Sequence, residues 1–130
     1  MTLVNQTRAS ILGDRIGIAN TSESRRMGLL SRRKLEHGDG LLLTDAQTIH
    51  TFGMKFPIDL VFIDGMGTVI GLSPDLQPGR TATLGIRTSV LELPAGTIAA
   101  TGTELGDSIV AEDRQRQTQM VPAYAGGNAC

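Results

Sequence analysis

The most hydrophobic stretch of the chain, residues 49–64, contains three side chains that could take part in chemistry. These are His50, Lys55 and Asp59 in the segment IHTFGMKFPIDLVFID. A histidine and a carboxylate are common general acid–base groups, and a lysine can stabilise developing negative charge. The same side chains could instead hold a small fold together through buried polar contacts. We favour the structural role for both Asp59 and His50.

Asp59 lies in a predicted strand whose two faces are both apolar. From residue 58 to residue 63 hydrophobic side chains alternate between the faces, and Asp59 is the exception. An unpaired carboxylate in such a place would lose its hydration or take up a proton, so it needs a partner. The candidate partners are Lys55, Arg25, Arg32 and the backbone N–H groups of residues 51–54.

Glu92 is the second carboxylate of interest. In the segment VLELP it points to the side opposite to Leu91 and Leu93, which is typical of the solvated face or the mouth end of a strand. Asp59 and Glu92 are the candidates for a two-carboxylate acid–base pair, although the sequence does not show that they face each other. Glycosidase-type chemistry also needs a large cleft, so we do not favour it.

The sequence predicts neither a metal site nor a cofactor site. The two histidines, His37 and His50, have no recognisable ligand spacing with nearby acids. The single cysteine, Cys130, excludes a zinc site of the paired-cysteine kind. The glycine-rich segment GMGTVIG differs from the dinucleotide-binding motif, because its third glycine falls one residue late. We therefore expect no metal and no cofactor.

Short apolar runs between turn residues predict a mainly β structure that would position these side chains. The predicted elements are a hairpin of residues 9–12 and 15–19, a helix over about 21–30, a strand at 40–44, a hairpin over 58–72, a strand that ends at Pro94, one or two helical turns from residue 97 and a strand at 107–111. Residues 73–87 contain Pro74, Pro78 and several glycines, and predict a long loop.

These elements predict a β-rich α+β fold. We expect a small, mostly antiparallel, barrel-like sheet with one N-terminal helix packed on it. The length of 130 residues fits a single domain, which we place at residues 1–111. Residues 112–130 are mainly polar and predict a disordered tail, because they offer little apolar surface to bury.

Charge and composition limit the classes of partner. The net charge of -1 provides no overall field toward phosphates or anionic membranes. With one tyrosine, three phenylalanines and no tryptophan, the chain also lacks the aromatic platforms that bind single-stranded nucleic acid. No apolar run is long enough for a signal peptide or a membrane span. We expect a cytoplasmic protein with no membrane partner, and the sequence disfavours nucleic acid.

Several motifs in order resemble one known family. They are R..GLL.R..L, then HTFGMKFPIDLVFID, then G.VI.L, then LELPAG, then GD.I. The chain resembles the family of domains of unknown function called DUF192 (UPF0127) over roughly residues 15–111. The matching residues are Arg25, Gly28, Leu29, Leu30, Arg32, Met54, Lys55, Pro57, Asp59, Phe62, Asp64, Glu92, Gly96, Gly106 and Asp107. The resemblance implies a small β-rich domain and no established activity.

The favoured function is therefore a non-catalytic module that binds a small molecule or a protein at the loops 44–56 and 73–87. One alternative is a small enzyme, such as a hydrolase, that uses His50 and Asp59 with Lys55 or Arg32 as an electrostatic partner. Another is an interaction module that docks through the five basic residues within 25–34. The candidate polar cluster is Arg25, Arg32, His50, Lys55, Asp59 and Glu92.

Overall fold

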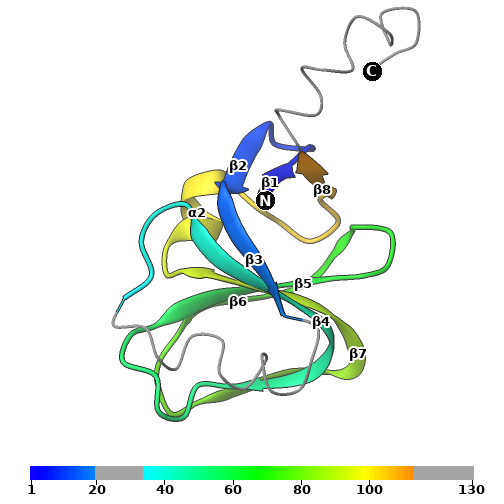
Figure 1. Ribbon diagram of the computed structural model, residues 1–130. Coiled ribbons are helices and arrows are strands. Elements are labelled where there is room, and N and C mark those ends of the chain that lie inside the picture. The colour runs from blue at the N-terminus through cyan, green and yellow to red at the C-terminus, as the bar shows by residue number, and fades with distance from the viewer. Residues whose placement is uncertain (20–33, 113–130) are drawn as a thin grey trace, which may run out of the picture.

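The computed structural model describes residues 1–19 and 34–112 of the protein (Figure 1). The described elements are β1 (Thr2–Asn5), β2 (Ser10–Gly13), β3 (Arg15–Ala19), β4 (Asp39–His50), β5 (Ile58–Ile63), β6 (Val69–Leu76), β7 (Thr81–Pro94), α2 (Thr97–Thr101) and β8 (Ile109–Glu112). The predicted helix at about 21–30 and residues 113–130 of the predicted tail lie outside the described residues, whereas Glu112, the first residue of that tail, belongs to β8.

The strands form two sheets. One has three strands in the order β2-β1-β8, and the other has five in the order β3-β4-β7-β5-β6. All neighbours are antiparallel except β3 and β4, which run parallel. The β-rich, mostly antiparallel fold is thus confirmed. The strands described here form two sheets and no closed barrel, so the barrel-like closure is not confirmed.

The hairpin predicted over residues 58–72 is present as β5 and β6. All six residues of β5 are buried, as expected for a strand with two apolar faces. The side chain of Asp64 stabilises the turn, because its Oδ1 accepts hydrogen bonds from the backbone N–H groups of Met66 and Thr68, each at 2.9 Å. Gly67 in this turn has a φ of 87°, a conformation that glycine adopts without strain.

The hairpin predicted around Gly13-Asp14 is wrong. β2 pairs with β1 in the small sheet, whereas β3 lies parallel to β4 in the large one. The apolar runs were correctly recognised as strands, but hydrophobic alternation identifies a strand without identifying its partner. Two consecutive strands joined by one residue therefore separate into different sheets.

The long loops predicted at 44–56 and 73–87 are largely strand. β4 continues to His50, β6 reaches Leu76 and β7 begins at Thr81. The loop prediction for residues 73–87 rested on Pro74, Pro78 and several glycines. Pro74 lies within β6, which is an edge strand whose pairing with β5 is irregular between Ile58 and Leu60. An edge strand with a bulge tolerates proline, because the missing N–H removes no required ladder bond.

The two faces of the large sheet support two apolar cores. On one face, residues from β5 and β7 pack against Leu3, Leu12 and Ile109 of the small sheet. On the other face, which we call the inner face, β5 and β7 contribute a second core. The residues of β5 and β7 in that second core are Ile58, Leu60, Phe62 and Val90.

The large sheet curls around its inner face. β4 and β7 are 12 and 14 residues long, and their pairing shifts register twice around Ala46. Such bulges bend and twist a strand. Leu84 of β7 consequently lies over Gly71 of β6, where a Cβ atom would be 2.9 Å from Leu84 Cδ2 and 3.2 Å from Phe62 Cδ1. This contact brings β7 and β6 together at the inner face.

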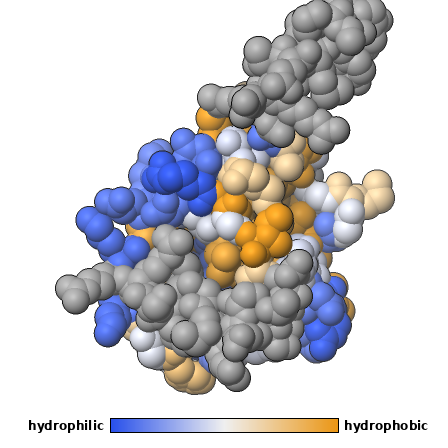
Figure 2. Space-filling view, in the orientation of Figure 1, coloured by the Kyte–Doolittle hydropathy of each residue, from blue (hydrophilic) through white to orange (hydrophobic). Residues whose placement is uncertain are grey.

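The surface visible in Figure 2 has both hydrophilic and hydrophobic areas. In Figure 2, hydrophilic side chains gather over the loop that leads into β4, and apolar side chains lie over β3. Ile18 of β3 is exposed, whereas Ile16 of the same strand is buried in the core between the sheets. Exposed apolar residues that occur singly are ordinary in a domain of this size.

Candidate functional site

Asp59 is buried, with 1% exposure, and all of its described hydrogen bonds come from backbone groups. Its Oδ1 accepts from the N–H of Asp75 at 2.8 Å, and its Oδ2 accepts from the N–H groups of Gly96 at 3.1 Å and Ile98 at 2.8 Å. Gly96 is the N-cap residue of α2 and has no side chain to cap the helix. Asp59 therefore caps α2 from the neighbouring strand and joins it to the end of β6.

The need of Asp59 for a partner is confirmed, but the partners predicted for it are wrong where the structure describes them. Lys55 is exposed and makes no hydrogen bond or ion pair with Asp59. The backbone donors belong to residues 75, 96 and 98 rather than to residues 51–54. Arg25 and Arg32 lie outside the described residues. The carboxylate of Asp59 is thus used to hold the fold.

His50 is far from Asp59 along the sheet. It is exposed at the end of β4 and pairs with Thr81 at the start of β7, whereas Asp59 pairs with Leu93 near the other end of β7. The imidazole ring stacks on Phe52, with ring centroids 5.5 Å apart and an interplanar angle of 25°. The structure therefore does not bring together the two residues on which the enzyme hypothesis depends.

Thr51, next to His50, is a structural residue that the sequence analysis did not single out. It is fully buried, and its hydroxyl donates to the carbonyl oxygen of Gln77 at 2.6 Å. The hydroxyl oxygen of Thr51 also accepts a hydrogen bond from the backbone N–H of Arg80 at 2.9 Å. Thr51 thereby fastens the turn between β6 and β7 to the end of β4, where the sequence predicted a binding loop.

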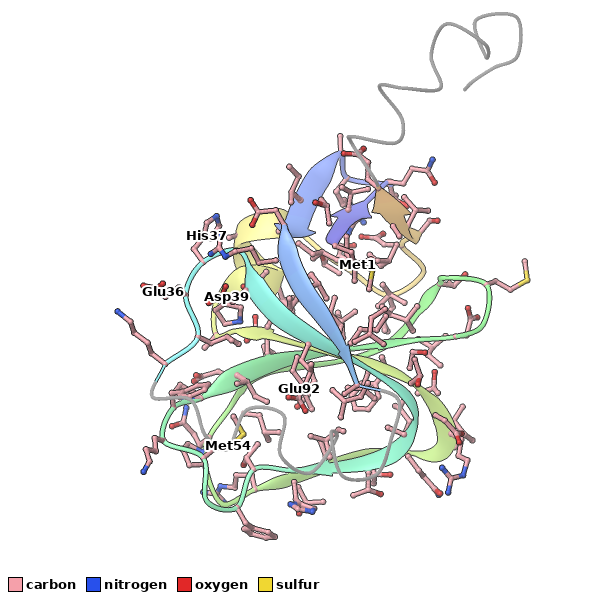
Figure 3. The ribbon with its side chains drawn as sticks, viewed as in Figure 1. Met1, Glu36, His37, Asp39, Met54 and Glu92 are labelled. Carbon is pink, nitrogen blue, oxygen red and sulfur yellow. The ribbon has the colours of Figure 1, made fainter. Side chains whose placement is uncertain are left out.

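Glu92 is buried, with 6% exposure, and lies on the inner face of the large sheet. Its register partners are Leu41 on β4 and Leu60 on β5, so it shares a face with both. Figure 3 shows its side chain directed from β7 toward the side of the sheet where Met54 also lies. The prediction of a solvated or mouth-facing position is wrong, because the side chain is buried.

The carboxyl group of Glu92 has an apolar environment. Its register partners Leu41 and Leu60 belong to the inner-face core, which also contains the buried Ile58, Phe62 and Val90 and the partly buried Met54, Phe56 and Ile70. Within residues 1–19 and 34–112, no group forms a hydrogen bond or ion pair with its oxygens. Burial alone raises the pKa of Glu92 to about 7. Near neutral pH this group can hold or release a proton, or accept hydrogen bonds from another molecule.

Asp59 and Glu92 do not form the two-carboxylate pair considered from the sequence. Glu92 lies opposite Leu60, and Asp59 lies opposite Leu93, so the two acids project from opposite faces of the same sheet. The backbone of β5 and β7 separates them, and a substrate could not contact both groups at once. The structure thus contradicts that arrangement.

A second polar cluster surrounds Asp107, which sequence reasoning found only through the GD motif of the resemblance. Its carboxylate accepts hydrogen bonds from Asn5 Nδ2 at 3.0 Å, from Arg8 Nε at 2.9 Å and from the backbone N–H of Glu104 at 2.9 Å. Thr103 accepts a further hydrogen bond from Asn5 at 3.0 Å. The hydrogen bond from Arg8, and then that from Asn5, hold the pKa of Asp107 well below its usual range.

The Asp107 cluster ties the N-terminal β1–β2 turn to the segment between α2 and β8. Its acceptors and donors satisfy one another across about 100 positions of sequence. Such a network stabilises a fold and leaves no oxygen of Asp107 free of a partner. We therefore assign this cluster to structure rather than to ligand binding.

The profile of the DUF192 family, described as "Uncharacterized ACR", matches residues 3–111. The chain belongs to the DUF192 family. No curated protein matches it. The family match covers every described element except the ends of β1 and β8.

Two crystal structures are similar to this DUF192 domain. A protein from Sinorhizobium meliloti 1021, provisionally described as a transcription regulator, is 24% identical with a TM-score of 0.72, and the match covers 84% of this chain and 89% of that one. A protein of unknown function from Novosphingobium aromaticivorans DSM 12444 is 21% identical with a TM-score of 0.72, covering 85% and 82% respectively. At these identities the similarity shows a shared fold.

The loop before β4 in this DUF192 domain includes His37, for which the sequence shows no spacing typical of metal ligands. Arg15 Nε contacts Asp39 Oδ1 at 2.8 Å, and Arg15 Nη2 donates to the carbonyl oxygen of His37 at 2.7 Å. Asp39 Oδ2 also accepts from the backbone N–H of Glu36 at 3.0 Å, so these groups order the loop (Figure 3). Across the described residues, no three acidic, histidine or cysteine side chains gather as metal ligands. The same residues contain no helix long and apolar enough to cross a membrane.

Proposed function

We propose that this DUF192 domain is a binding module for a small, largely apolar molecule, which it holds against the inner face with Glu92 as the polar contact. One observation carries the proposal: a carboxyl group with 6% exposure has no hydrogen-bonding partner among the described residues. Nearly all buried polar groups in native proteins are hydrogen-bonded, so a group without a partner needs an explanation. A ligand that supplies the missing hydrogen bonds is such an explanation.

Stability alone gives no reason for a glutamate at this position. Both register partners of Glu92 are leucines, and an apolar side chain there would extend the surrounding core without any desolvation penalty. Residues that reduce stability at a defined place in a fold are commonly those that serve function. The contrast with Asp59, which receives three backbone hydrogen bonds, supports assigning different roles to the two acids.

Other functions have less support. The hydrolase hypothesis needs a free carboxylate near His50, and the Asp59 carboxylate already accepts three hydrogen bonds. The description of the Sinorhizobium protein raises the question of nucleic acid, which the net charge of -1 disfavours for this chain. Binding to nucleic acid tighter than about 10⁻⁶ M at physiological salt would contradict this view, because ordinary non-specific binding there is about 10⁻⁴–10⁻⁶ M.

A thermal-shift screen tests the proposed function. The wild-type domain, Glu92→Leu and the control Glu36→Gln are screened against the same panel of small metabolites. Glu36 is a suitable control because its side chain is exposed and its only described ion pair, with Lys34, lies at the surface. A ligand at 100 times its dissociation constant adds about 2.7 kcal/mol to stability.

We expect at least one compound to raise the melting temperature of the wild-type domain and of Glu36→Gln but not of Glu92→Leu. A compound that stabilises all three proteins equally binds elsewhere and does not support the proposal. Compounds that bind only at His50 or at the basic segment, as shown by loss of binding in His50→Ala or Arg25→Ala, would contradict it.

A further inference from the structure

We propose that the molecule bound at the inner face is an organic cation, an amine with an apolar body, whose ammonium group pairs with the carboxylate of Glu92. This inference rests on the proposed function and names its ligand class. It follows from the charge on the inner face, from the location of the described cations and from the kind of side chains beside Glu92.

The described part of the chain provides no positive charge that pairs with Glu92. The part of the chain that the structure describes contains six basic residues, and all six are exposed; they are Arg8, Arg15, Lys34, Lys55, Arg80 and Arg87. Four of them form ion pairs with acids other than Glu92. None forms a hydrogen bond or ion pair with Glu92, so no described cation neutralises its carboxylate. A ligand that carries a positive charge is complementary to such a group.

An ammonium group would pair strongly with the carboxylate of Glu92. In an apolar, poorly hydrated environment an opposite charge within about 4–6 Å strongly favours the ionised form of a carboxyl group. An ammonium group would supply three N–H donors to the oxygens of Glu92, which have no described donor of their own. A neutral alcohol would supply one donor and no charge, and a carboxylate ligand would repel the ionised acid.

The inner-face core also contains side chains that suit the apolar part of such a ligand. Two of the three phenylalanines of the chain, Phe56 and Phe62, belong to the same inner-face core, together with Met54. Aromatic faces attract cations, and a methionine side chain adapts to apolar groups of different shape. These neighbours suit the hydrocarbon part of an amine and add to the preference for a cationic head.

Three probes of the same size and shape test the inference: 2-phenylethylamine, 2-phenylethanol and phenylacetate. Their binding to the full chain is measured by NMR titration at pH 5, 6, 7 and 8, with wild-type protein, Glu92→Gln and the control Glu36→Gln. The amine remains protonated throughout this range. Binding to the ionised form of Glu92 requires the acid to lose its proton, and burial raises its pKa to about 7. The affinity for the amine should therefore fall about tenfold per pH unit below 7, and about 100-fold from pH 8 to pH 5.

At pH 8 we expect the wild-type protein and Glu36→Gln to bind the amine at least tenfold more tightly than the alcohol. Glu92→Gln should lose this preference and the pH dependence, while it still unfolds cooperatively. Tight binding of the alcohol or of phenylacetate that depends on Glu92, without binding of the amine, would overturn the ligand class and leave the proposed function standing. Binding of none of the three probes by the folded protein would count against both.

One further comparison tests whether the chain itself supplies the cation. Arg25 and Arg32 lie outside the described residues, so the titration is repeated with Arg25→Ala and Arg32→Ala. The inference expects the same amine affinity as in the wild-type protein. If the amine binds only after one of these arginines has been removed, Glu92 belongs to an internal ion pair, and the inference is overturned.

Discussion

Replacement of Glu92 by glutamine should stabilise the domain at pH 8 and have much less effect at pH 5. Burial raises the pKa of Glu92 from 4.5 to about 7. Below pH 4.5 the group is protonated in both the folded and the unfolded protein. As the pH rises from 4.5 to 7, the unfolded chain releases the proton while the folded protein retains it, so the stability of the folded state falls. Above pH 7 both states are ionised and the loss is complete.

The size of this effect follows from the same two values. The rise from 4.5 to about 7 corresponds to a loss of about 3–4 kcal/mol at high pH, at about 1.4 kcal/mol for each unit of pKa. By pH 5 less than about 1 kcal/mol of it has been lost, so the change between pH 5 and pH 8 is about 2–3 kcal/mol. The glutamine in Glu92→Gln keeps the shape of the side chain but cannot ionise. The stability of this variant therefore does not fall with pH through residue 92.

Urea denaturation of the wild-type protein and Glu92→Gln at pH 5 and pH 8 measures the effect. Other titrating groups, Asp107 among them, contribute equally to both proteins and cancel in the difference. We expect Glu92→Gln to gain about 2–3 kcal/mol relative to the wild-type protein between the two pH values, and Glu36→Gln to change by less than about 0.5 kcal/mol. A constant difference between pH 5 and pH 8 would refute the assignment of a buried carboxyl group without a partner. A loss of stability in Glu92→Gln at pH 8 would show that the acid is paired with a cation.

Three other changes test the structural assignments. Asp59→Asn should lower the free energy of unfolding by about 1–4 kcal/mol in urea, because an amide cannot accept all three backbone hydrogen bonds, whereas His50→Ala should change it by less than about 0.5 kcal/mol. Asp107→Asn should melt at a lower temperature than the wild-type protein at pH 7, and the gap should narrow as the pH falls below 3.8, since the lowered pKa of Asp107 stabilises the fold only while the group is ionised. Deletion of residues 114–130 should leave the melting temperature within a few degrees, and a fall of more than about 8 °C would show that they contribute to the fold.

Local patterns in the sequence were sufficient to predict the centre of the fold. The alternation of residues 58–63 predicted a strand with two apolar faces, and every residue of β5 is buried. The glycine turn after Asp64 predicted the hairpin to β6, and the segment TIAAT forms the short helix α2. Each of these features depends on neighbours within a few positions, which is the range over which propensity and periodicity act.

Partners that lie far apart in the sequence could not be predicted in this way. The sequence placed β2 and β3 together because they are adjacent in the chain, but their partners are β1 and β4. It also predicted that Asp59 is buried and needs a partner, and the predicted partners were the side chains of Lys55, Arg25 and Arg32 or the backbone of residues 51–54. Two of the actual donors lie 37 and 39 positions away, at the start of α2. Backbone donors of this kind leave no mark in residue type.

The position of Glu92 was half predicted. Alternation correctly placed it on the face opposite to Leu91 and Leu93, but a strand with one polar position is ordinarily taken to face solvent there. Glu92 is instead buried, and it shares the inner face with Leu41 and Leu60 of the two neighbouring strands. Whether a face is buried depends on this tertiary arrangement, which no single strand encodes.

Asp59 and Glu92 occupy neighbouring strands of one sheet, and their amide variants should have opposite effects at pH 8. Asp59 accepts three backbone hydrogen bonds, so the loss of its charge leaves donors unsatisfied and the fold less stable. Glu92 has no described donor, so the loss of its charge removes a desolvation penalty and the fold becomes more stable. A common structural role for the two acids would give losses of the same sign. Opposite signs, measured in one buffer on one domain, would distinguish the acid that holds the fold from the acid that is available to a ligand.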